Sequence, residues 1–338
     1  MNRPIKTFDR LPQATRMAAP WRRLAASEER ASPLVGVVRN PRSYGNKDRP
    51  PELAADAEVI TETTLKRREL VEVLGRFAVA GVDYIAIDGG DGTVRDVLTA
   101  GDAIFGDEWP PLIVLPKGKT NALASDLRLP RDWSLARAIE LARAGSVTLR
   151  RPLVVAEAAL PDARVQGFML GAGVFTRSIS LGQSAHRWGA FNALAVLVTT
   201  IWSLVQAFFA NAGNAWRQTT GIRLSDDAGN PVAGKESKRY VLLSSTLERF
   251  PMGLKPFGNI REGLKLVVLD RPWRRSLARI PLVATGRRPS NPARLGYHWA
   301  TPDSYLIHLD DRFILDGEAF PPGEYRISQG PELRFVVP

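Results

Sequence analysis

The sequence lacks cysteine altogether and has few histidines. Among its 338 residues there is no Cys, and the three histidines are His186, His298 and His308. Without thiols there are no disulfides, no thiolate metal sites and no cysteine nucleophiles. Because the histidines are far apart in the sequence, we read each of them as a structural residue rather than as part of a histidine-rich metal centre.

The start of the chain lacks the continuous apolar run of a secretory signal. Residues 1–32 are rich in Arg, Ala and Pro. We read them as a flexible basic arm, and the alternative is an arm that lies on a membrane surface with Trp21 inserted.

Long apolar runs are also scarce, with one exception. Residues 188–210 carry no charged side chain, and about 20 apolar residues can span a bilayer. Their polar members fall on one face of a helix, however, which a lone span does not need. We therefore expect a buried or lipid-facing helix within the second domain, and a transmembrane span is the alternative. The polar members are Asn192, Thr199, Ser203 and Gln206.

Positive charge, by contrast, is in excess. The chain has 46 Lys and Arg against 35 Asp and Glu, a net charge of +11. Such a balance favours an anionic partner, namely nucleic acid, an anionic membrane surface or a phosphorylated ligand. The aromatic residues are not interleaved with the basic ones as a stacking platform would require, so we do not expect nucleic-acid binding.

The hydrophobic pattern divides the chain into two folded domains after the basic arm. In residues 33–145, apolar β-branched runs alternate with segments of helical spacing, which predicts βαβ units and a Rossmann-like, mostly parallel sheet. In residues 146–338, strand-like runs follow one another with few helices, which predicts an antiparallel, sandwich-like β-rich domain.

A glycine-rich turn, IDGGDGTV, joins a predicted strand to a predicted helix in the first domain. Gly89, Gly90 and Gly92 allow close approach of a ligand to the backbone, and the helix N–H groups attract phosphate. Thr93 can cap the helix or contact a phosphate. Asp91 would repel phosphate unless Mg²⁺ lay between them or the carboxylate took a proton from an attacking hydroxyl. The alternative is a helix cap.

Two further glycine loops follow neighbouring strands. They read RNPRSYGNK after the first strand and LPKGKTNALASDL after the fourth. The carboxyl ends of parallel strands lie at one edge of a sheet, where ligands bind in α/β folds. The three loops are therefore expected to converge on a nucleoside triphosphate site.

The motifs NPRSYGN, VITET, GGDGTVRDVL, LPKGKTNALASDL, GAGVF and LDGEAF occur in this order. In this the sequence resembles the diacylglycerol kinase-like lipid kinases, a family that includes sphingoid-base, ceramide and bacterial lipid kinases. The resemblance extends over roughly residues 33–325 and implies a first domain like that of NAD kinases and phosphofructokinases.

The resemblance implies a set of site residues. It implies that ATP is bound by Asn40, Ser43, Thr61, Gly89, Gly90, Gly92, Thr93, Gly118, Lys119, Thr120 and Asn121. It implies Mg²⁺ at Asp91, and a catalytic group of Asp91, Asp316 and Glu318 in which Glu318 takes the proton of the lipid hydroxyl. We expect Asp316 and Glu318 to share one face of a strand and to face Asp91 across a cleft.

The sequence departs from the family pattern at several positions. Asp96 stands for a glutamate, and Lys119 for a threonine, where it can supply a point charge to a phosphate. Phe175 stands where many relatives have an acidic residue that contacts the substrate. Glu262 and Lys265 replace two aspartates that can bind a structural metal, so we do not expect Mg²⁺ there.

The sequence thus predicts an ATP- and Mg²⁺-dependent kinase acting on a diacylglycerol-, sphingoid- or ceramide-like hydroxyl. We expect a cytoplasmic protein, peripheral at the inner face of an anionic membrane, and leave open whether it is a homodimer. The alternatives are a kinase of NAD or another soluble alcohol, and a non-catalytic nucleotide- or lipid-binding homologue. Asp91→Ala is expected to abolish transfer and to leave the fold intact.

Overall fold

The computed structural model describes residues 7–13, 30, 32–63, 67–174, 176, 208 and 214–338. These residues form two compact units, which are considered separately below. Unit 1 takes its described residues from Met1–Leu11, Leu153–Arg164 and Phe168–Gln329, and unit 2 from Pro12–Pro152, Val165–Gly167 and Gly330–Pro338. The domain boundaries expected from the sequence stay a prediction.

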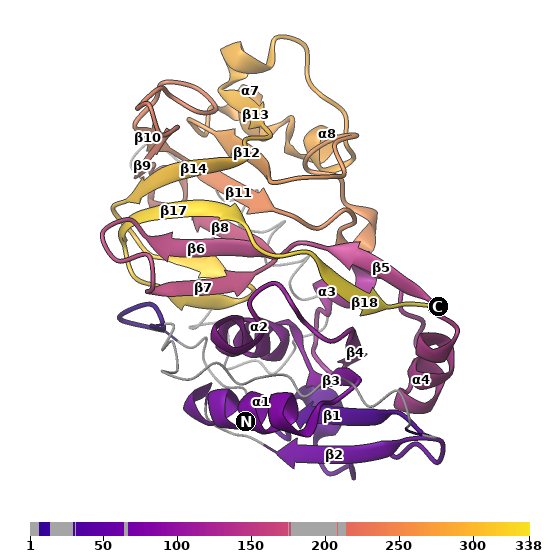
Figure 1. Ribbon diagram of the computed structural model, residues 1–338. Coiled ribbons are helices and arrows are strands. Elements are labelled where there is room, and N and C mark those ends of the chain that lie inside the picture. Colours follow the sequence, from indigo (N-terminus) through magenta and orange to yellow (C-terminus); the bar gives the residue numbers. More distant parts are fainter. Residues whose placement is uncertain are drawn as a thin grey trace. The chain divides into compact units, whose positions relative to one another are not determined.

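Unit 2 is built on one sheet with the strand order β2-β1-β3-β4-β18-β5 (Figure 1). The strands are β1 (Leu34–Arg39), β2 (Glu58–Thr63), β3 (Tyr84–Gly89), β4 (Leu112–Pro116), β5 (Val147–Arg150) and β18 (Leu333–Val336). The pairs β2–β1, β1–β3 and β3–β4 are parallel. The predicted Rossmann-like parallel sheet is therefore confirmed for these strands, and β5 makes the sheet mixed because it pairs with β18 in the antiparallel sense.

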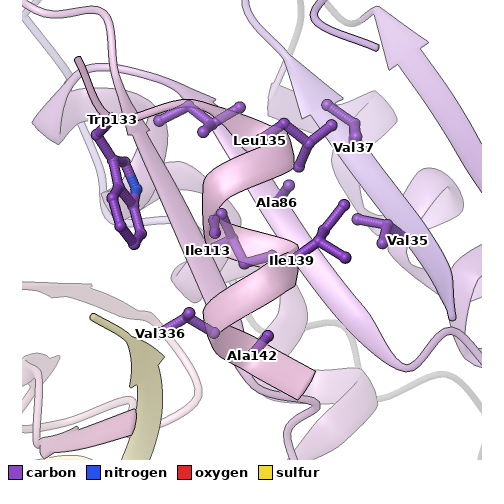
Figure 2. Packing of buried hydrophobic residues seen from close by; sticks show 11 residues of the cluster. Val35, Val37, Ala86, Ile113, Trp133, Leu135, Ile139, Ala142 and Val336 are labelled. Atoms are coloured by element: carbon purple, nitrogen blue, oxygen red, sulfur yellow. The ribbon is translucent and has the colours of Figure 1, made fainter. Parts of the chain in front are cut away.

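The helices of unit 2 lie on both faces of this sheet. They are α1 (Arg67–Ala80), α2 (Asp91–Phe105), α3 (Ala122–Asp126) and α4 (Leu135–Arg143), with a short 3-10 helix η1 (Tyr44–Asn46). Val35 and Val37 of β1 pack in a cluster with Leu135 and Ile139 of α4 (Figure 2). Successive strand residues face opposite ways. Accordingly, a Cβ on the intervening glycine of β1 would strike Phe77 of α1, so α1 and α4 cover opposite faces.

The last strand of the chain belongs to this first sheet. Phe335 of β18 pairs with Leu112 of β4 in the parallel sense, and Val336 is buried in the cluster below α4 (Figure 2). The sequence pattern does not predict a strand here. Four residues after a proline carry too little periodicity to be distinguished from a tail.

Unit 1 contains two antiparallel sheets. One has the order β10 (Lys238–Arg239), β9 (Thr220–Ser225), β14 (Ser304–Leu309), β17 (Gly323–Gln329) and β6 (Leu153–Glu157). The other has the order β13 (Tyr297–Ala300), β12 (Lys265–Leu269), β11 (Val241–Ser245), β8 (Met169–Gly173), β15 (Phe313–Leu315) and β16 (Glu318–Phe320). Between β6 and β8 along the chain lies β7 (Arg164–Gly167), which passes from unit 1 into unit 2.

The two sheets of unit 1 pack face to face. The ring of Phe313 on β15 meets the ring of Tyr325 on β17 edge-on, with 5.1 Å between centroids. The predicted sandwich-like antiparallel fold is therefore confirmed. The helices described for this unit are short: η3 (Ala215–Arg217), η4 (Pro251–Gly253), α7 (Arg274–Leu277), α8 (Ile280–Ala284) and η5 (Pro292–Leu295).

Several predictions concern residues outside the described ranges. Phe175, most of the basic arm and residues 188–210 apart from Phe208 belong to this group. Phe208 itself is partly buried and packs against a core cluster of unit 1. Within the described ranges, no helix has both the length and the apolar composition needed to cross a membrane.

Candidate functional site

The three glycine loops of unit 2 meet at the carboxyl ends of β1, β3 and β4. The backbone N–H of Asn40 donates to the carbonyl of Asp88 at 3.0 Å. The N–H of Lys117 donates to the carbonyl of Gly89 at 2.8 Å, and its own carbonyl accepts from the N–H of Gly45 at 2.9 Å. The predicted convergence of the loops is therefore confirmed, since each loop is hydrogen-bonded to a neighbour.

Glycine is needed where these loops touch. A Cβ on Gly90 would lie 2.8 Å from the Cα of Gly118 in the next loop, and that contact is backbone against backbone. A Cβ on Gly89 would lie 2.4 Å from Thr93 Oγ1. The same Thr93 oxygen accepts from Asn40 Nδ2 at 2.9 Å. The first two loops are thus joined through side chains as well, and Thr93 is buried.

Asp91 holds the start of the next helix rather than capping its own. It is the first residue of α2, whose N-cap is Gly90. Its carboxylate accepts from the backbone N–H of Ala122 at 2.9 Å and of Leu123 at 3.2 Å, so it satisfies two N-terminal donors of α3. Burial raises the pKa of Asp91, and these two hydrogen bonds oppose that rise.

The third loop is shaped by Asn121. Its backbone is left-handed, with φ of 51°, a conformation that asparagine tolerates better than most residues. Its side chain accepts from the N–H of Gly118 at 2.7 Å and donates to the carbonyl of the same residue at 3.0 Å. This closes a tight turn and leaves Lys119 and Thr120 exposed at its tip.

Three other predicted nucleotide-binding residues, Ser43, Gly92 and Thr61, are tied less closely into the contacts between the loops. The N–H of Ser43 donates to the carbonyl of Asn40 at 3.1 Å, and the carbonyl of Gly92 accepts from Arg95 Nη2 at 3.3 Å. Thr61 lies opposite Val37 in β2, two residues before the strand ends. It is therefore on the edge strand and set back from the loops.

A buried ion pair below the loops was not found by sequence reasoning. Arg39 Nη1 lies 2.5 Å from Asp88 Oδ2, and both side chains are almost fully buried. Arg39 Nη2 also donates to the carbonyl of Arg49 at 2.6 Å, and Asn46 Nδ2 donates to the carbonyl of Asp88 at 3.0 Å. Burial raises the pKa of Asp88, although the Asn46 and Arg39 hydrogen bonds oppose this. The pair fixes the first loop from within.

Asp96, which stands for a family glutamate, is held by two arginines. Its Oδ1 lies 2.5 Å from Arg67 Nη2 and 2.9 Å from Arg95 Nη2. Arg95 is fully buried. Burial alone would raise the pKa of Asp96, but the two arginines outweigh it and lower the pKa. Arg95 and the shorter carboxylate of Asp96 thus form an ion pair, which balances the negative charge of Asp96 within the protein.

The acidic residues near the end of the chain lie in a hairpin, not along one strand. Asp316 and Gly317 form the turn between β15 and β16, both with positive φ (45° and 83°), and Glu318 is the first residue of β16. The premise that Asp316 and Glu318 share a strand face is therefore wrong: two positive φ values reverse the chain at Asp-Gly.

Asp316 fastens this hairpin to the neighbouring strand. Its carboxylate accepts from the N–H of Phe168 at 3.0 Å and of Met169 at 3.0 Å, and its own N–H donates to the Met169 carbonyl at 3.0 Å. Asp316 therefore acts as a positioning residue, and Glu318, two residues further along the chain, is half-buried. Their position across a cleft from Asp91 stays a prediction.

Thr7 and Phe8, which belong to the predicted basic arm, lie against this hairpin. Thr7 forms a parallel bridge with Ala319 of β16. The N–H of Phe8 donates to the carbonyl of Ala319 at 2.9 Å, and its ring stacks on Phe320 with 5.0 Å between centroids. Arg312 Nη1 donates to the Phe8 carbonyl at 2.7 Å. The strand that begins with Glu318 is therefore supported on its outer side.

The loop-bearing part of unit 2 matches a known family. Residues 37–150 match the diacylglycerol kinase catalytic domain. This part of the chain therefore belongs to the diacylglycerol kinase catalytic domain family. The match includes all three glycine loops and ends well before the acidic hairpin, so the expected family is confirmed for the part of the chain that carries these loops.

Curated relatives of the family match over short stretches. The probable lipid kinase YegS of Escherichia coli O17:K52:H18 is 42% identical over 65 residues, 19% of this chain and 21% of the relative. The protein of the same name from Shigella flexneri is 39% identical over 66 residues, 20% of this chain and 21% of the relative. The chain spans about a fifth of the length of these relatives.

Solved structures match over nearly the whole chain. Two from Bacillus anthracis strain Sterne have TM-scores of 0.64 and 0.58 at 16% and 15% identity, and each comparison covers 91% of this chain and 97% of the other. The second is named a diacylglycerol kinase. At this identity the likeness shows that the fold is shared.

One departure from the family's metal-binding pattern has a visible physical consequence. Lys265, in the place of an aspartate, is 1% exposed. Its Nζ donates to the carbonyls of Arg261 at 2.6 Å and Gly263 at 3.1 Å. An ammonium group thus lies among the carbonyl oxygens of this turn, and its charge repels a divalent cation.

Proposed function

We propose that this protein is a kinase that transfers the γ-phosphoryl group of ATP to a lipid hydroxyl. The observation that carries the proposal is the hydrogen-bonded set of three glycine loops at the carboxyl ends of β1, β3 and β4. They lie within the residues that match the diacylglycerol kinase catalytic domain. The names of the YegS relatives favour a lipid as the acceptor.

The loops would bind the triphosphate through backbone N–H groups and small side chains. Gly89, Gly90 and Gly92 leave room for phosphate oxygens to approach the start of α2, whose N–H groups and dipole favour negative charge. Exposed Lys119 and Thr120 would reach the phosphates from the third loop. Phosphoryl transfer depends mainly on positioning and on neutralising charge, which such a cradle provides.

Asp91 suits a role beside Mg²⁺ through water. A carboxylate has about four lone-pair sites, and the two hydrogen bonds from α3 use one on each oxygen. Mg²⁺ commonly keeps several waters and binds through one or two carboxylates and substrate phosphates. Asp91 would therefore hold the hydrated ion, which would supply charge neutralisation at the β- and γ-phosphates.

Glu318 would accept the proton of the attacking hydroxyl. The hydroxyl oxygen would form a bond to the γ-phosphorus, the bond from that phosphorus to the β–γ bridging oxygen would break, ADP would leave, and the proton would pass to the Glu318 carboxylate. Asp316 would position the hairpin through Phe168 and Met169, as its hydrogen bonds indicate.

The experiment is a transfer assay with labelled ATP and Mg²⁺ on a panel of diacylglycerol, sphingoid and ceramide acceptors, read by mass spectrometry. We expect one class to be phosphorylated by the wild type and, at least 100-fold more slowly, by Glu318→Gln. Glu324→Gln, at an exposed glutamate of the same unit, serves as the matched control and is expected to retain activity.

Two outcomes would replace this proposal by another. Phosphorylation of NAD or another soluble alcohol, saturable without vesicles or detergent, would make the protein a soluble-substrate kinase. Thermal stabilisation by ATP with no transfer to any acceptor, even at high protein concentration, would make it a non-catalytic nucleotide-binding homologue.

A further inference from the structure

One part of unit 1 carries positive charge and has no acidic residue within its own sequence. Residues 271–302 contain no Asp or Glu, and their arginines are all exposed. We call these side chains the arginine surface: Arg271, Arg274, Arg275, Arg279, Arg287, Arg288 and Arg294. Two of them lie on α7 and Arg294 lies on η5, while the others lie in the segments that flank α7 and α8 (Figure 1). In the described part of the chain, Arg271 alone among them pairs with a carboxylate, that of Glu236 at 3.5 Å.

Exposed apolar side chains accompany these arginines. Trp273, just before α7, is 37% exposed, and the guanidinium carbon of Arg275 lies 4.6 Å from its ring centroid. Met252 and Leu254, at the η4 turn, are 60% and 41% exposed. The turn that follows them is hydrogen-bonded to the end of α8, because the N–H of Lys255 donates to the carbonyl of Ala284 at 2.8 Å.

The arginine surface rests on a packed base. Leu277 of α7 and Val283 of α8 are buried in a cluster with Tyr240, which lies between β10 and β11, and with Tyr297 of β13. Ser276 Oγ donates to the carbonyl of Leu295 at 2.7 Å. The charged and apolar side chains are therefore displayed from a fixed scaffold, so docking there would cost little ordering of the backbone.

We infer that the arginine surface docks unit 1 onto an anionic lipid bilayer. The arginines bind the headgroup phosphates, and Trp273, Met252 and Leu254 enter the boundary between headgroups and acyl chains. The combination matters, because charge alone gives long-range attraction and apolar side chains give the short-range contact. This inference rests on the proposed function, since a lipid acceptor lies in such a bilayer.

The same side chains are a poor match for single-stranded nucleic acid. Binding of that kind uses successive aromatic faces on which bases stack. Here the guanidinium of Arg275 lies over the ring of Trp273, and that of Arg288 lies over Trp299 at 5.1 Å. Exposed Met252 and Leu254 offer no stacking face.

The test is sedimentation of the purified protein with vesicles of phosphatidylcholine, with or without phosphatidylglycerol, in the absence of ATP. We expect the wild type to bind the anionic vesicles, to bind less as salt is added, and not to bind the neutral ones. Changing Arg274, Arg275, Arg287 and Arg288 to Gln together is expected to lower the partition coefficient on the order of 1000-fold.

A matched control removes the same charge elsewhere. Arg68, Arg131, Arg137 and Lys238 are exposed and lie outside the arginine surface; the four are changed to Gln together and should leave vesicle binding nearly unchanged. Equal losses in both quadruple variants would overturn the inference, because net charge alone would then explain binding. Trp273→Ala is a second variant, expected to weaken the vesicle binding that remains at high salt. Unchanged binding would show that Trp273 makes no apolar contact with the bilayer.

The outcomes separate this inference from the proposed function. If the wild type ignores anionic vesicles yet phosphorylates detergent-dispersed lipid, the docking inference fails and the kinase proposal stands. If it binds vesicles through the arginine surface but phosphorylates no acceptor, the kinase proposal fails and the docking inference stands. RNA binding that the quadruple arginine variant loses, without vesicle binding, would assign the surface to a different partner.

Discussion

Replacing Asp91 by alanine removes the acceptor that holds the start of α3. In the native protein its two carboxylate oxygens accept the N–H groups of Ala122 and Leu123. Both of these residues are buried, at 5% and 2% exposed. Asp91→Ala therefore leaves two backbone donors without a partner in addition to removing a carboxylate from the proposed phosphate cradle.

The expected loss of stability follows from this count. A buried donor left unsatisfied costs about 1–3 kcal/mol, so two donors give an upper limit near 6 kcal/mol. Asp91 is half-exposed, and water entering the vacated space will satisfy part of the loss. Burial also raises the pKa of the carboxyl, so removing the ionised group relieves some of the cost of its burial. We expect a net loss of about 2–4 kcal/mol.

Two measurements check this value. Urea unfolding, followed by tryptophan fluorescence, should show a lower midpoint for Asp91→Ala than for the wild type. Hydrogen exchange at the amides of Ala122 and Leu123 should be faster, because these are the bonds that are lost. Asp107→Ala, at an exposed aspartate of the same unit, is the matched control and should change neither quantity.

An unchanged urea midpoint together with unchanged exchange at these two amides would refute the reasoning. The expectation from the sequence, that Asp91→Ala would abolish transfer with the fold intact, stays a prediction, and these contacts add an expected loss of stability. A loss of activity in this variant therefore mixes a chemical effect with a structural one. Asp91→Asn keeps one acceptor oxygen at α3, so it is the better variant for testing the role in phosphoryl transfer.

The remaining predictions concern the loops, the hairpin and the paired acid. Gly90→Ala should weaken ATP binding at least tenfold in a titration, because its Cβ would lie 2.8 Å from the Cα of Gly118 and overpacking of this kind costs about 1–3 kcal/mol; wild-type affinity would contradict the close approach. Asp316→Ala should lower the stability measured in urea by about 2–4 kcal/mol, since it loses the hydrogen bonds to two backbone N–H groups. Asp316→Asn should cost less, because asparagine tolerates the positive φ, and an equal cost would count against this account. The pKa of Asp96 is lowered in the fold, so its contribution to stability is present above the ordinary value near 3.9 and is lost as pH falls; in urea unfolding, the difference between wild type and Asp96→Asn should shrink from pH 5 to about pH 3, and a constant difference would exclude this linkage.

The parallel strands and glycine loops of unit 2 could be predicted from the sequence because their signals are local. The strands β1, β3 and β4 are short apolar runs, and each is followed within two residues by Asn or Gly. Parallel strands bring such loops to one edge whatever the details of packing. The loop at Gly89 and the loop at Gly118 were therefore expected together, and the structure joins them by backbone hydrogen bonds.

What only the tertiary structure decided are contacts between residues far apart in the chain. The sequence shows Asp91 next to glycines, but not that its carboxylate reaches α3, 31 residues further on. It shows Asp316 and Glu318 two residues apart, but the positive φ of Asp316 places one in a turn and the other on a strand. Thr7 and Phe8 pair with Ala319 of β16, which lies near the other end of the chain. Spacing fixes which residues are neighbours along a strand or helix, whereas long-range partners are selected by packing, which no local pattern records.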